Sequence, residues 1–405
     1  MDEIFERIVI DEINKFIDSD EVIVLHGARQ VGKTCILRFL QDQLKDRGDT
    51  TYFIDLEDSR YVKILDAGID SFLRHLDEEG VTSSGRGRKC FILIDEIQYL
   101  AAPSSFLKLV ADHHKNLKLI VSGSSSFAIK TKFKDTLVGR TVNFEIFTLS
   151  FREFLLFNRV HFEEGKAYTE KKVDELKAKF KEYILFGGYP KIVLTPEVEK
   201  KEKYQQQIID TYVKKDIRDL AGVRDIDKFN KLLEVLAGQS GQLVNMTELS
   251  NTTRIAIQTI EKYLFILENT YILKRIRPFS RNIRSELFKL PKIYFYDTGL
   301  MQMLWLKKLP REIIGQVFET GIFAELAKKY GRESVFYWRT KDKKEIDFIL
   351  RIKDALIPIE VKLNYEQFHP TAIRYFNEHY GIDNYRIVGL NGIPKDPRCV
   401  YPWDV

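Results

Sequence analysis

The segment Gly27–Thr34, which reads GARQVGKT, constrains the fold of this chain more than any other segment. It fits the pattern GxxxxGK[ST], directly after the apolar run Val22–Leu25 and directly before a helical pattern at Cys35–Leu44. A strand, a glycine loop and a helix in this order turn backbone N–H groups and a helix N-terminus toward an anion. The sequence therefore predicts an α/β domain that binds the phosphates of a nucleotide.

The residue types in this loop predict the ligand. The Lys33 ammonium reaches the β- and γ-phosphates, and the Thr34 hydroxyl ligates Mg²⁺. We therefore expect ATP and Mg²⁺ as cofactors. The predicted nucleotide contacts are the loop and the residue after it, namely Gly27, Ala28, Arg29, Gln30, Val31, Gly32, Lys33, Thr34 and Cys35.

Three further apolar runs, at Thr51–Ile54, Phe91–Ile94 and Leu117–Val121, predict a parallel sheet, because short continuous apolar runs mark strands buried on both faces. The run at 91–94 ends in Asp95 and Glu96, at the strand end where ligands bind in open α/β sheets. Asp95 is the predicted Mg²⁺ ligand, and Glu96 is predicted to polarise the attacking water. The alternative is an exposed acidic pair at a strand end.

Three other features each leave two alternatives open. Ser124, in the segment after the run at 117–121, either senses the γ-phosphate or belongs to a turn. Arg140 is either an arginine finger on a neighbouring subunit's nucleotide, which requires a homo-oligomer, or part of a structural ion pair. The segment Gly187–Pro190 either forms a ledge against the adenine or ends a helix.

Length and composition bound the rest of the chain. At 405 residues the chain exceeds what one hydrophobic core supports, which predicts two to three domains. Its three cysteines, Cys35, Cys90 and Cys399, have neither a disulfide nor a zinc spacing. No apolar run reaches the length of a membrane span. We therefore expect a cytoplasmic protein that does not contact a membrane.

The excess positive charge of the chain is concentrated in one segment. The whole chain has a net charge of +5, whereas residues 274–292 contain seven basic residues and one acidic residue, a net charge of +6. A lysine-glutamate run at residues 197–203 separates this region from the preceding helical block, and we expect a hinge there.

The region before the basic segment predicts a helix-turn-helix. Thr247 can cap a short helix, and a second helix runs from about Arg254 to Glu268. One face of this second helix is apolar and contains Ile257, Ile260, Leu264 and Leu267. Another face carries Arg254, Gln258 and Lys262, at the i, i+4 and i+8 positions. These three residues either enter a groove of DNA or form an ordinary solvated face.

The segment after the second helix predicts a wing. A strand at Tyr271–Ile276 leads into the basic stretch through Lys292. Lys274, Arg275 and Arg277 are predicted phosphate contacts, because such contacts supply most non-specific DNA affinity. Winged helices attached to ATPases also bind proteins or act as lids, so a protein partner stays open.

The last block contains a helical pattern at Arg311–Tyr330 and three strand patterns, Val335–Thr340, Glu345–Ile352 and Leu356–Leu363. The period of two places Asp347 on one face of the second strand, and Glu360 with Lys362 on one face of the third. A hairpin brings these side chains together. Two carboxylates that share a divalent cation beside a lysine suit phosphodiester hydrolysis. The alternative is a surface hairpin with alternating charges.

The glycine loop, the Asp95-Glu96 pair, Leu149–Phe154 (LSFREF) and Gly187–Pro190 (GGYP) together resemble a widespread prokaryotic family of AAA-type ATPases. The resemblance implies an α/β fold with a P-loop AAA-type core at 1–150 and a helical lid at 151–203. It also implies a winged helix at 204–289 and an α/β restriction-endonuclease-like domain at 290–405.

The pattern Asp347…Glu360-Val361-Lys362 resembles the PD-(D/E)xK nucleases, with Ile346 in place of the proline. The resemblance implies that Asp347 and Glu360 bind a metal ion and that Lys362 assists catalysis. Glu319 matches the helix glutamate that often completes such sites, and Glu325 is its rival.

These observations lead to one principal hypothesis and one alternative. The principal hypothesis is an Mg²⁺-dependent ATPase that acts on DNA, by binding, remodelling or processing, with an attached metal-dependent nuclease-like domain. The alternative is a nucleotide-controlled switch or scaffold that binds a protein partner, in which the nuclease-fold domain is catalytically silent.

Overall fold

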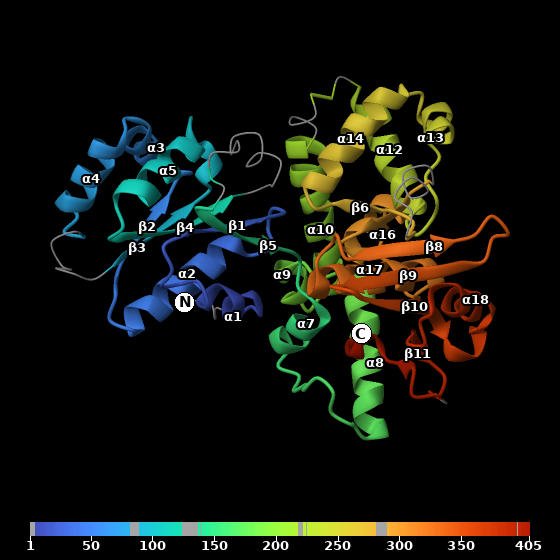
Figure 1. Cartoon of the computed structure of the whole chain (residues 1–405). Helices are drawn as coiled ribbons and strands as arrows, with labels where there is room; N and C mark the ends of the chain where they lie inside the picture. The colour runs from blue at the N-terminus through green and yellow to red at the C-terminus, as the bar shows by residue number, and fades with distance from the viewer. Residues whose placement is uncertain are drawn as a thin grey trace. The chain divides into compact units, whose positions relative to one another are not determined.

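The computed structural model describes residues 5–81, 89–123, 137, 139–217, 222–223, 225–280, 290–394 and 396–405. The chain divides into two compact units, residues 1–147 and residues 148–405, which are described separately (Figure 1). Within the described ranges, no helix combines the length and the apolar character needed to cross a membrane.

The first unit is built on a sheet of five parallel strands in the order β2-β3-β4-β1-β5. The strands are β1 (Val22–Gly27), β2 (Thr50–Asp55), β3 (Cys90–Asp95), β4 (Leu117–Gly123) and β5 (Thr141–Ile146). Every residue of β3 and β4 is buried, which agrees with the continuous apolar runs. The prediction of a parallel sheet is confirmed; β5 is an additional strand at its edge.

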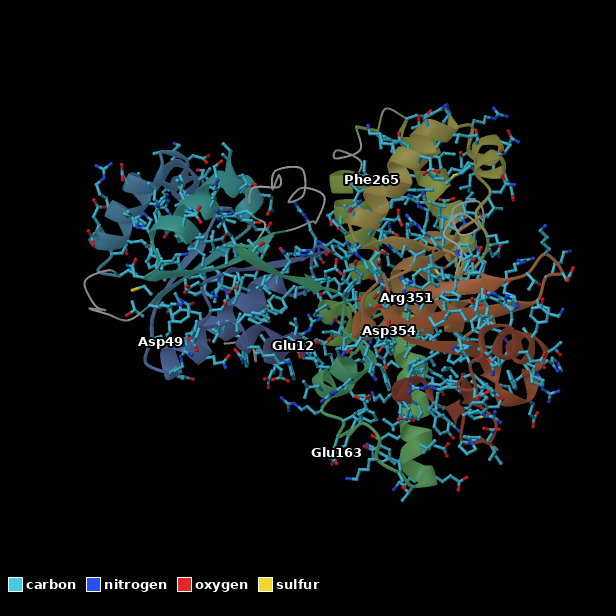
Figure 2. All side chains as sticks on the ribbon, viewed as in Figure 1. Glu12, Asp49, Glu163, Phe265, Arg351 and Asp354 are labelled. Atoms are coloured by element: carbon cyan, nitrogen blue, oxygen red, sulfur yellow. The ribbon has the colours of Figure 1, made fainter. Side chains whose placement is uncertain are left out.

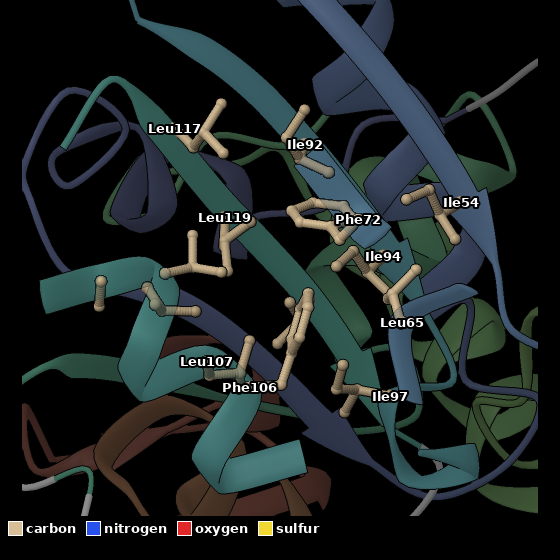
Figure 3. Packing of buried hydrophobic residues seen from close by; sticks show 14 of the residues in the cluster. Ile54, Leu65, Phe72, Ile92, Ile94, Ile97, Phe106, Leu107, Leu117 and Leu119 are labelled. Atoms are coloured by element: carbon tan, nitrogen blue, oxygen red, sulfur yellow. The ribbon is translucent and has the colours of Figure 1, made fainter. Parts of the chain in front are cut away.

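Helices cover both faces of this sheet (Figure 1). They are α1 (Val9–Asn14), α2 (Lys33–Asp46), α3 (Ser59–Asp66), α4 (Ile69–Glu78), the short 3₁₀ helix η1 (Ile97–Tyr99) and α5 (Pro103–His113). A buried apolar cluster joins the sheet to α3, α4 and α5, with Phe72 in edge-to-face contact with Phe106 at its centre (Figure 3). This core fixes β1, β3 and β4 and so positions the residues at their carboxyl ends.

The second unit begins with helices. They are α7 (Phe151–Phe157), α8 (Glu170–Phe186), α9 (Pro190–Val193), α10 (Val198–Ile208) and a π-helix, η3 (Ile209–Ile217). Ser150 caps α7 in a reciprocal capping box with Glu153. The predicted hinge at 197–203 is wrong, because α10 runs through most of it and buries Lys201 beside Glu182.

The Gly187–Pro190 segment ends α8. Gly187 has a φ of +81°, and a Cβ atom on it would lie 2.3 Å from Oδ1 of Asp297. The Gly188 N–H donates to Oδ2 of Asp297 at 2.8 Å. Of the two alternatives for this segment, the structure shows the helix end, in which glycine is required by both the backbone conformation and the close carboxylate.

Three helices and two strands follow: α12 (Ile226–Gly238), α13 (Met246–Thr253), α14 (Ile257–Asn269), β6 (Leu273–Ile276) and β7 (Lys292–Phe295). The strands pair antiparallel, and Leu243, between α12 and α13, forms a bridge with Lys292. A turn of three residues joins α13 to α14, as a helix-turn-helix requires.

Three details of this region differ from the sequence predictions. Asn245 rather than Thr247 caps α13, because its side-chain oxygen accepts from two backbone N–H groups. Arg254 is not on α14, because it has a left-handed conformation with φ of 56° and ends α13. Ile257, at the start of α14, is 39% exposed and does not join the packed face of Ile260, Leu264 and Leu267.

The rest of the second unit contains a five-stranded mixed sheet in the order β12-β11-β10-β9-β8. Its strands are β8 (Val335–Arg339), β9 (Glu345–Ile352), β10 (Ala355–Asn364), β11 (Arg386–Asn391) and β12 (Cys399–Val400). Strands β8, β9 and β10 form the predicted antiparallel meander, whereas β11 pairs with β10 in parallel. The helices are α16 (Thr298–Leu306), α17 (Gly315–Tyr330), α18 (Thr371–Tyr380) and the 3₁₀ turns η4 (Tyr365–Gln367) and η5 (Pro402–Asp404).

Candidate functional site

The glycine loop joins β1 to α2, and its shape requires glycine at both ends. A Cβ atom on Gly27 would lie 2.0 Å from the Ile146 carbonyl oxygen of the neighbouring strand β5. Gly32 has a φ of 95°, in the left-handed region that favours glycine, and α2 begins at the next residue. The loop therefore leads into the N-terminus of a helix of 14 residues, where phosphate binding is favoured.

Lys33 is buried within this loop. Its Nζ donates to the carbonyl oxygens of Ala28 at 2.7 Å and Gly27 at 3.4 Å. Burial lowers the pKa of Lys33 to about 8, against the opposing charges of Glu96 and Asp95. The ammonium is thus a desolvated cation on neutral acceptors, and an anionic phosphate would be a better partner for it.

Two acidic side chains face Lys33 from the end of β3. Asp95 is buried, and its Oδ1 accepts hydrogen bonds from the Ser122 hydroxyl and from the Glu96 N–H at 3.1 Å. Glu96 has a left-handed backbone with a φ of 56°, and Gln98 Nε2 donates to its Oε2. Burial raises the pKa of Glu96, against the opposing charge of Lys33. Strained backbone of this kind is concentrated at functional sites.

Thr34 and Asp95 supply the oxygen ligands that Mg²⁺ prefers, at the first turn of α2 and at the end of β3. The residue types therefore fit a magnesium nucleotide. Ser124 lies outside the described residues.

Arg7 was not found by sequence reasoning. Its buried guanidinium donates to the carbonyl oxygens of Val31 at 2.7 Å and Phe147 at 3.1 Å. It therefore ties the glycine loop to the last residue of the first unit. A single arginine twenty residues before the loop carries no motif, so no sequence signal identifies it.

Arg140 forms an ion pair with Asp112 of the same unit, at 2.6 Å between Nε and Oδ1. The structural alternative for this residue is thus observed. Its role as an arginine finger stays a prediction.

In the second unit, the hairpin of β9 and β10 brings Asp347, Glu360 and Lys362 together. Lys362 Nζ lies 3.1 Å from Asp347 Oδ2 and 2.9 Å from Glu360 Oε2. The Val361 N–H also donates to Asp347 Oδ2, at 2.8 Å. The period-two pattern of the sequence therefore identified side chains that are in contact.

Burial and neighbouring charges shift the pKa values of these carboxyl groups. Burial, with the Asp347 charge, raises the pKa of Glu360 to about 8. Burial and Asp347 likewise raise the pKa of Glu319 to about 7. Burial also acts to raise the pKa of Asp347, but the Lys362 and Lys292 charges outweigh it, and that pKa lies below its ordinary value.

Glu319 rather than Glu325 belongs to this carboxylate cluster, which we define as Glu319, Asp347 and Glu360. Glu325 is occupied elsewhere, because it accepts hydrogen bonds from the Phe151 N–H at 2.9 Å and the Tyr183 hydroxyl at 2.5 Å. Lys292 and Tyr294 of β7 also contact Glu319, and sequence reasoning missed that role for both.

The carboxylate cluster fits a divalent cation in ligand chemistry, because Mg²⁺ is commonly bound by one or two carboxylates and several waters. Among the described residues, however, no group of three or more His, Cys, Asp or Glu side chains is arranged to hold a metal ion. In this arrangement the Lys362 ammonium bonds to both Asp347 and Glu360.

The predicted DNA contacts divide into two groups. Arg254, Gln258, Lys262 and Arg277 are exposed. Lys274 instead pairs with Glu333 at 2.5 Å, and Arg275 pairs with Glu261 at 2.6 Å and with Glu268 at 2.8 Å. DNA contact by these two paired residues stays a prediction.

The prediction that the basic stretch through Lys292 carries phosphate contacts is wrong at Lys292, because this side chain is buried. Arg281, Arg284 and Lys289 of the same stretch lie outside the described residues.

The geometry of the first unit defines a P-loop nucleotide-binding domain. Residues 19–155 match the family model for an AAA domain. Residues 177–312 and 314–393 match two families described as domains of unknown function, DUF8612 and DUF4143.

Proteins of similar sequence align with this chain over most of their length. An uncharacterized protein of Haemophilus influenzae is 28% identical over 392 residues, covering 95% of this chain and 92% of the relative. One from Methanocaldococcus jannaschii is 25% identical, covering 86% of this chain and 79% of the relative. The solved Aeropyrum pernix ORC2 protein in its ADP form is 11% identical, with a TM-score of 0.34, over 66% of this chain and 85% of that chain. A likeness that weak says nothing about function.

Proposed function

We propose that this chain is an Mg²⁺-dependent ATPase that acts on DNA. The observation that carries the proposal is the buried Lys33 in a glycine loop beside Asp95 and Glu96, within a domain that matches the AAA family. A desolvated ammonium and two strand-end carboxylates are the groups that phosphoryl transfer to water requires.

Each residue has a distinct role in this proposal. The loop N–H groups and Lys33 bind the phosphates, and Thr34 and Asp95 would hold Mg²⁺. When bound, Mg²⁺ neutralises the charge that develops on the transferring phosphoryl group. Glu96 orients and polarises the attacking water. The Ser122 hydroxyl and the Glu96 N–H both bond to Asp95, which fixes the two carboxylates relative to each other.

The region α12–β7 is proposed to be a winged helix that docks on DNA. Its order of helices, the Leu243 bridge and the β6-β7 pair support this proposal. Arg254 in the turn, Gln258 and Lys262 on α14 and Arg277 after β6 are exposed and suit contacts with phosphates or base edges. We also propose that the chain forms a homo-oligomer in which Arg140 acts as an arginine finger on the nucleotide of a neighbouring subunit.

The last domain is proposed to be a PD-(D/E)xK nuclease-like domain, in which Asp347 and Glu360 bind a divalent cation. Lys362 would orient the nucleophile, and Glu319 would complete the carboxylate cluster. The contacts of Lys362 with both carboxylates support this assignment.

One observation favours a second candidate function, a nucleotide-controlled switch or scaffold with a catalytically silent last domain. The Lys362 ammonium already pairs with both Asp347 and Glu360, and the described residues contain no group of three or more His, Cys, Asp or Glu side chains that could hold a metal ion. Two carboxylates that already share an ammonium attract a further cation less strongly.

ATP turnover with and without DNA tests the proposal. We expect the protein to hydrolyse ATP in the presence of Mg²⁺, at a rate that changes when duplex, single-stranded or branched DNA is added. The Lys33→Ala variant should not hydrolyse ATP. Lys45→Ala, which removes an exposed lysine of the same helix, is the matched control and should behave as wild type. Turnover that survives Lys33→Ala would refute the ATPase assignment.

Two further results separate the candidates. Asp347→Ala should remove metal-dependent cleavage of DNA and leave ATP turnover unchanged. ATP turnover by a chain that binds none of the three DNA forms at low salt would favour the switch.

A further inference from the structure

The strand β7 belongs to two parts of the second unit at once. Its backbone pairs with β6 and with Leu243, inside the proposed winged helix. Two of its side chains, Lys292 and Tyr294, contact Glu319 of α17, in the carboxylate cluster. The proposed DNA-docking region therefore contributes directly to the surroundings of the proposed metal site.

The contacts of Tyr294 are specific. Its ring is fully buried and stacks on Phe323 of α17, with the ring centroids 4.8 Å apart. Its hydroxyl donates to Oε1 of Glu319. Three other buried tyrosines of this unit donate to main-chain carbonyl oxygens: Tyr212, Tyr365 and Tyr183, the last of which also donates to Glu325. The Tyr294 hydroxyl is instead directed at one carboxylate of the cluster.

Lys292 supplies the second donor. Its buried Nζ lies 2.5 Å from Glu345 Oε1 and 3.5 Å from Glu319 Oε1. Glu345 in turn pairs with Arg339 at 3.0 Å. The ammonium therefore joins Glu319 to the start of β9, the strand that carries Asp347 two residues further along.

The loop between α12 and α13 closes the same side of the site. The Gly241 N–H donates to the Ile293 carbonyl of β7 at 2.6 Å, and a Cβ atom on Gly241 would lie 3.5 Å from Glu319 Oε1. The hydroxyls of Ser240 and Thr320, the residue after Glu319, are 2.8 Å apart. Glu319 is thus enclosed by elements of the proposed winged helix.

The Glu319 side chain is 20% exposed and lies close enough to Asp347 for the two negative charges to repel each other. Neighbouring donors and cations offset this repulsion. In metal sites, such outer partners fix the orientation of the ligating groups and are required for full affinity. We propose that Tyr294 and Lys292 are positioning residues that hold Glu319 beside Asp347, so that the wing strand supports the pair of carboxylates, Asp347 and Glu360, that would bind a divalent cation. This inference rests on the proposed metal site of the last domain.

The test is Mn²⁺ binding to the full-length chain without nucleotide, measured by calorimetry. The signal is defined as the binding lost in Asp347→Ala. Because loss of an outer partner costs about 10-fold to 100-fold in metal affinity, Tyr294→Phe is expected to weaken this binding about 10-fold or more. Tyr365→Phe, which removes a buried hydroxyl bonded to main-chain carbonyls, is the matched control and should leave the affinity unchanged.

Variants of Lys292 test the same inference if Tyr294→Phe does not fold. Lys292→Met should weaken the Asp347-dependent binding, and Lys292→Arg should restore part of it, because the arginine keeps the cation. Wild-type affinity in folded Tyr294→Phe or Lys292→Met would overturn the inference while leaving the metal site itself in place. No Asp347-dependent binding in the wild type would overturn the metal site and the inference together.

Discussion

Replacing Lys33 with methionine should stabilise the first unit in the absence of nucleotide while abolishing ATP binding. The buried ammonium costs free energy, since its pKa falls from 10.5 to about 8. A lowering of about 2.5 pKa units at about 1.4 kcal/mol each corresponds to about 3 kcal/mol. Loss of the hydrogen bond to Ala28 offsets about 1 kcal/mol of this gain. The expected net gain in the free energy of unfolding is therefore about 2 kcal/mol at pH 7.

The two units can be followed separately in one urea titration. In a background with Cys35→Ser and Cys399→Ser, the remaining thiol is Cys90, buried in β3, which becomes reactive when the first unit unfolds. All three tryptophans, Trp305, Trp338 and Trp403, lie in the second unit and report on it by fluorescence. Lys33→Met should raise the midpoint for Cys90 by roughly 1 M urea and leave the tryptophan midpoint unchanged.

The pH dependence gives the sign of the effect. Below pH 8 both the folded and the unfolded chain hold the Lys33 proton, and the cost is fully present. Between pH 8 and 10.5 the folded chain releases the proton first, so wild-type stability rises with pH and the advantage of Lys33→Met shrinks. No gain at pH 7, or a gain of the same size at pH 10, would refute this reasoning.

Four further substitutions test other parts of the account. Gly27→Ala forces a Cβ atom to 2.0 Å from the Ile146 carbonyl oxygen, so the Cys90 midpoint should fall and nucleotide binding should be lost, without change in tryptophan fluorescence. Gln98→Ala removes the donor to Glu96, so kcat for ATP should fall while fluorescent-nucleotide affinity stays at the wild-type value; a reduced affinity would contradict this role. Arg254→Ala and Lys262→Ala should each weaken binding to all DNA sequences and reduce the slope of log affinity against log salt by about 1, which an unchanged slope would contradict.

The geometry of the proposed nucleotide site was predictable because each of its signals is local. A continuous apolar run predicts a buried strand, and the glycine pattern fixes the loop that follows it. Lys33, Thr34 and Asp95 therefore fall where the sequence predicted. Arg7 did not, because its partners Val31 and Phe147 are main-chain carbonyls 24 and 140 residues away, and any residue type supplies a carbonyl.

The carboxylate cluster was predictable in part. Asp347, Glu360 and Lys362 share one hairpin, so period-two alternation was enough to bring them together. Tyr294 and Lys292 come from β7, which is not part of that hairpin. In the sequence, Lys292 looks like one more member of a basic stretch, and only the pairing of β7 shows that it is buried.

The helix-turn-helix shows how small backbone details change an interpretation. The spacing of Arg254, Gln258 and Lys262 suits one helix face, but Arg254 adopts a left-handed conformation and ends the preceding helix. Side chains left exposed on α14 include Phe265, which is 52% exposed (Figure 2). Periodicity identified the helix and most of its packed face, but its start depended on a cap that the sequence does not mark.

Nucleotide turnover by Glu96→Gln tests the central claim most directly. The isolated protein would be incubated with ATP and Mg²⁺, desalted, and measured for retained nucleotide and released phosphate. Because Glu96 acts on the attacking water while Lys33 and the loop bind the phosphates, Glu96→Gln should retain ATP and release no phosphate, whereas the wild type releases phosphate continuously. Equal phosphate release by the two proteins, or none by the wild type, would contradict the account.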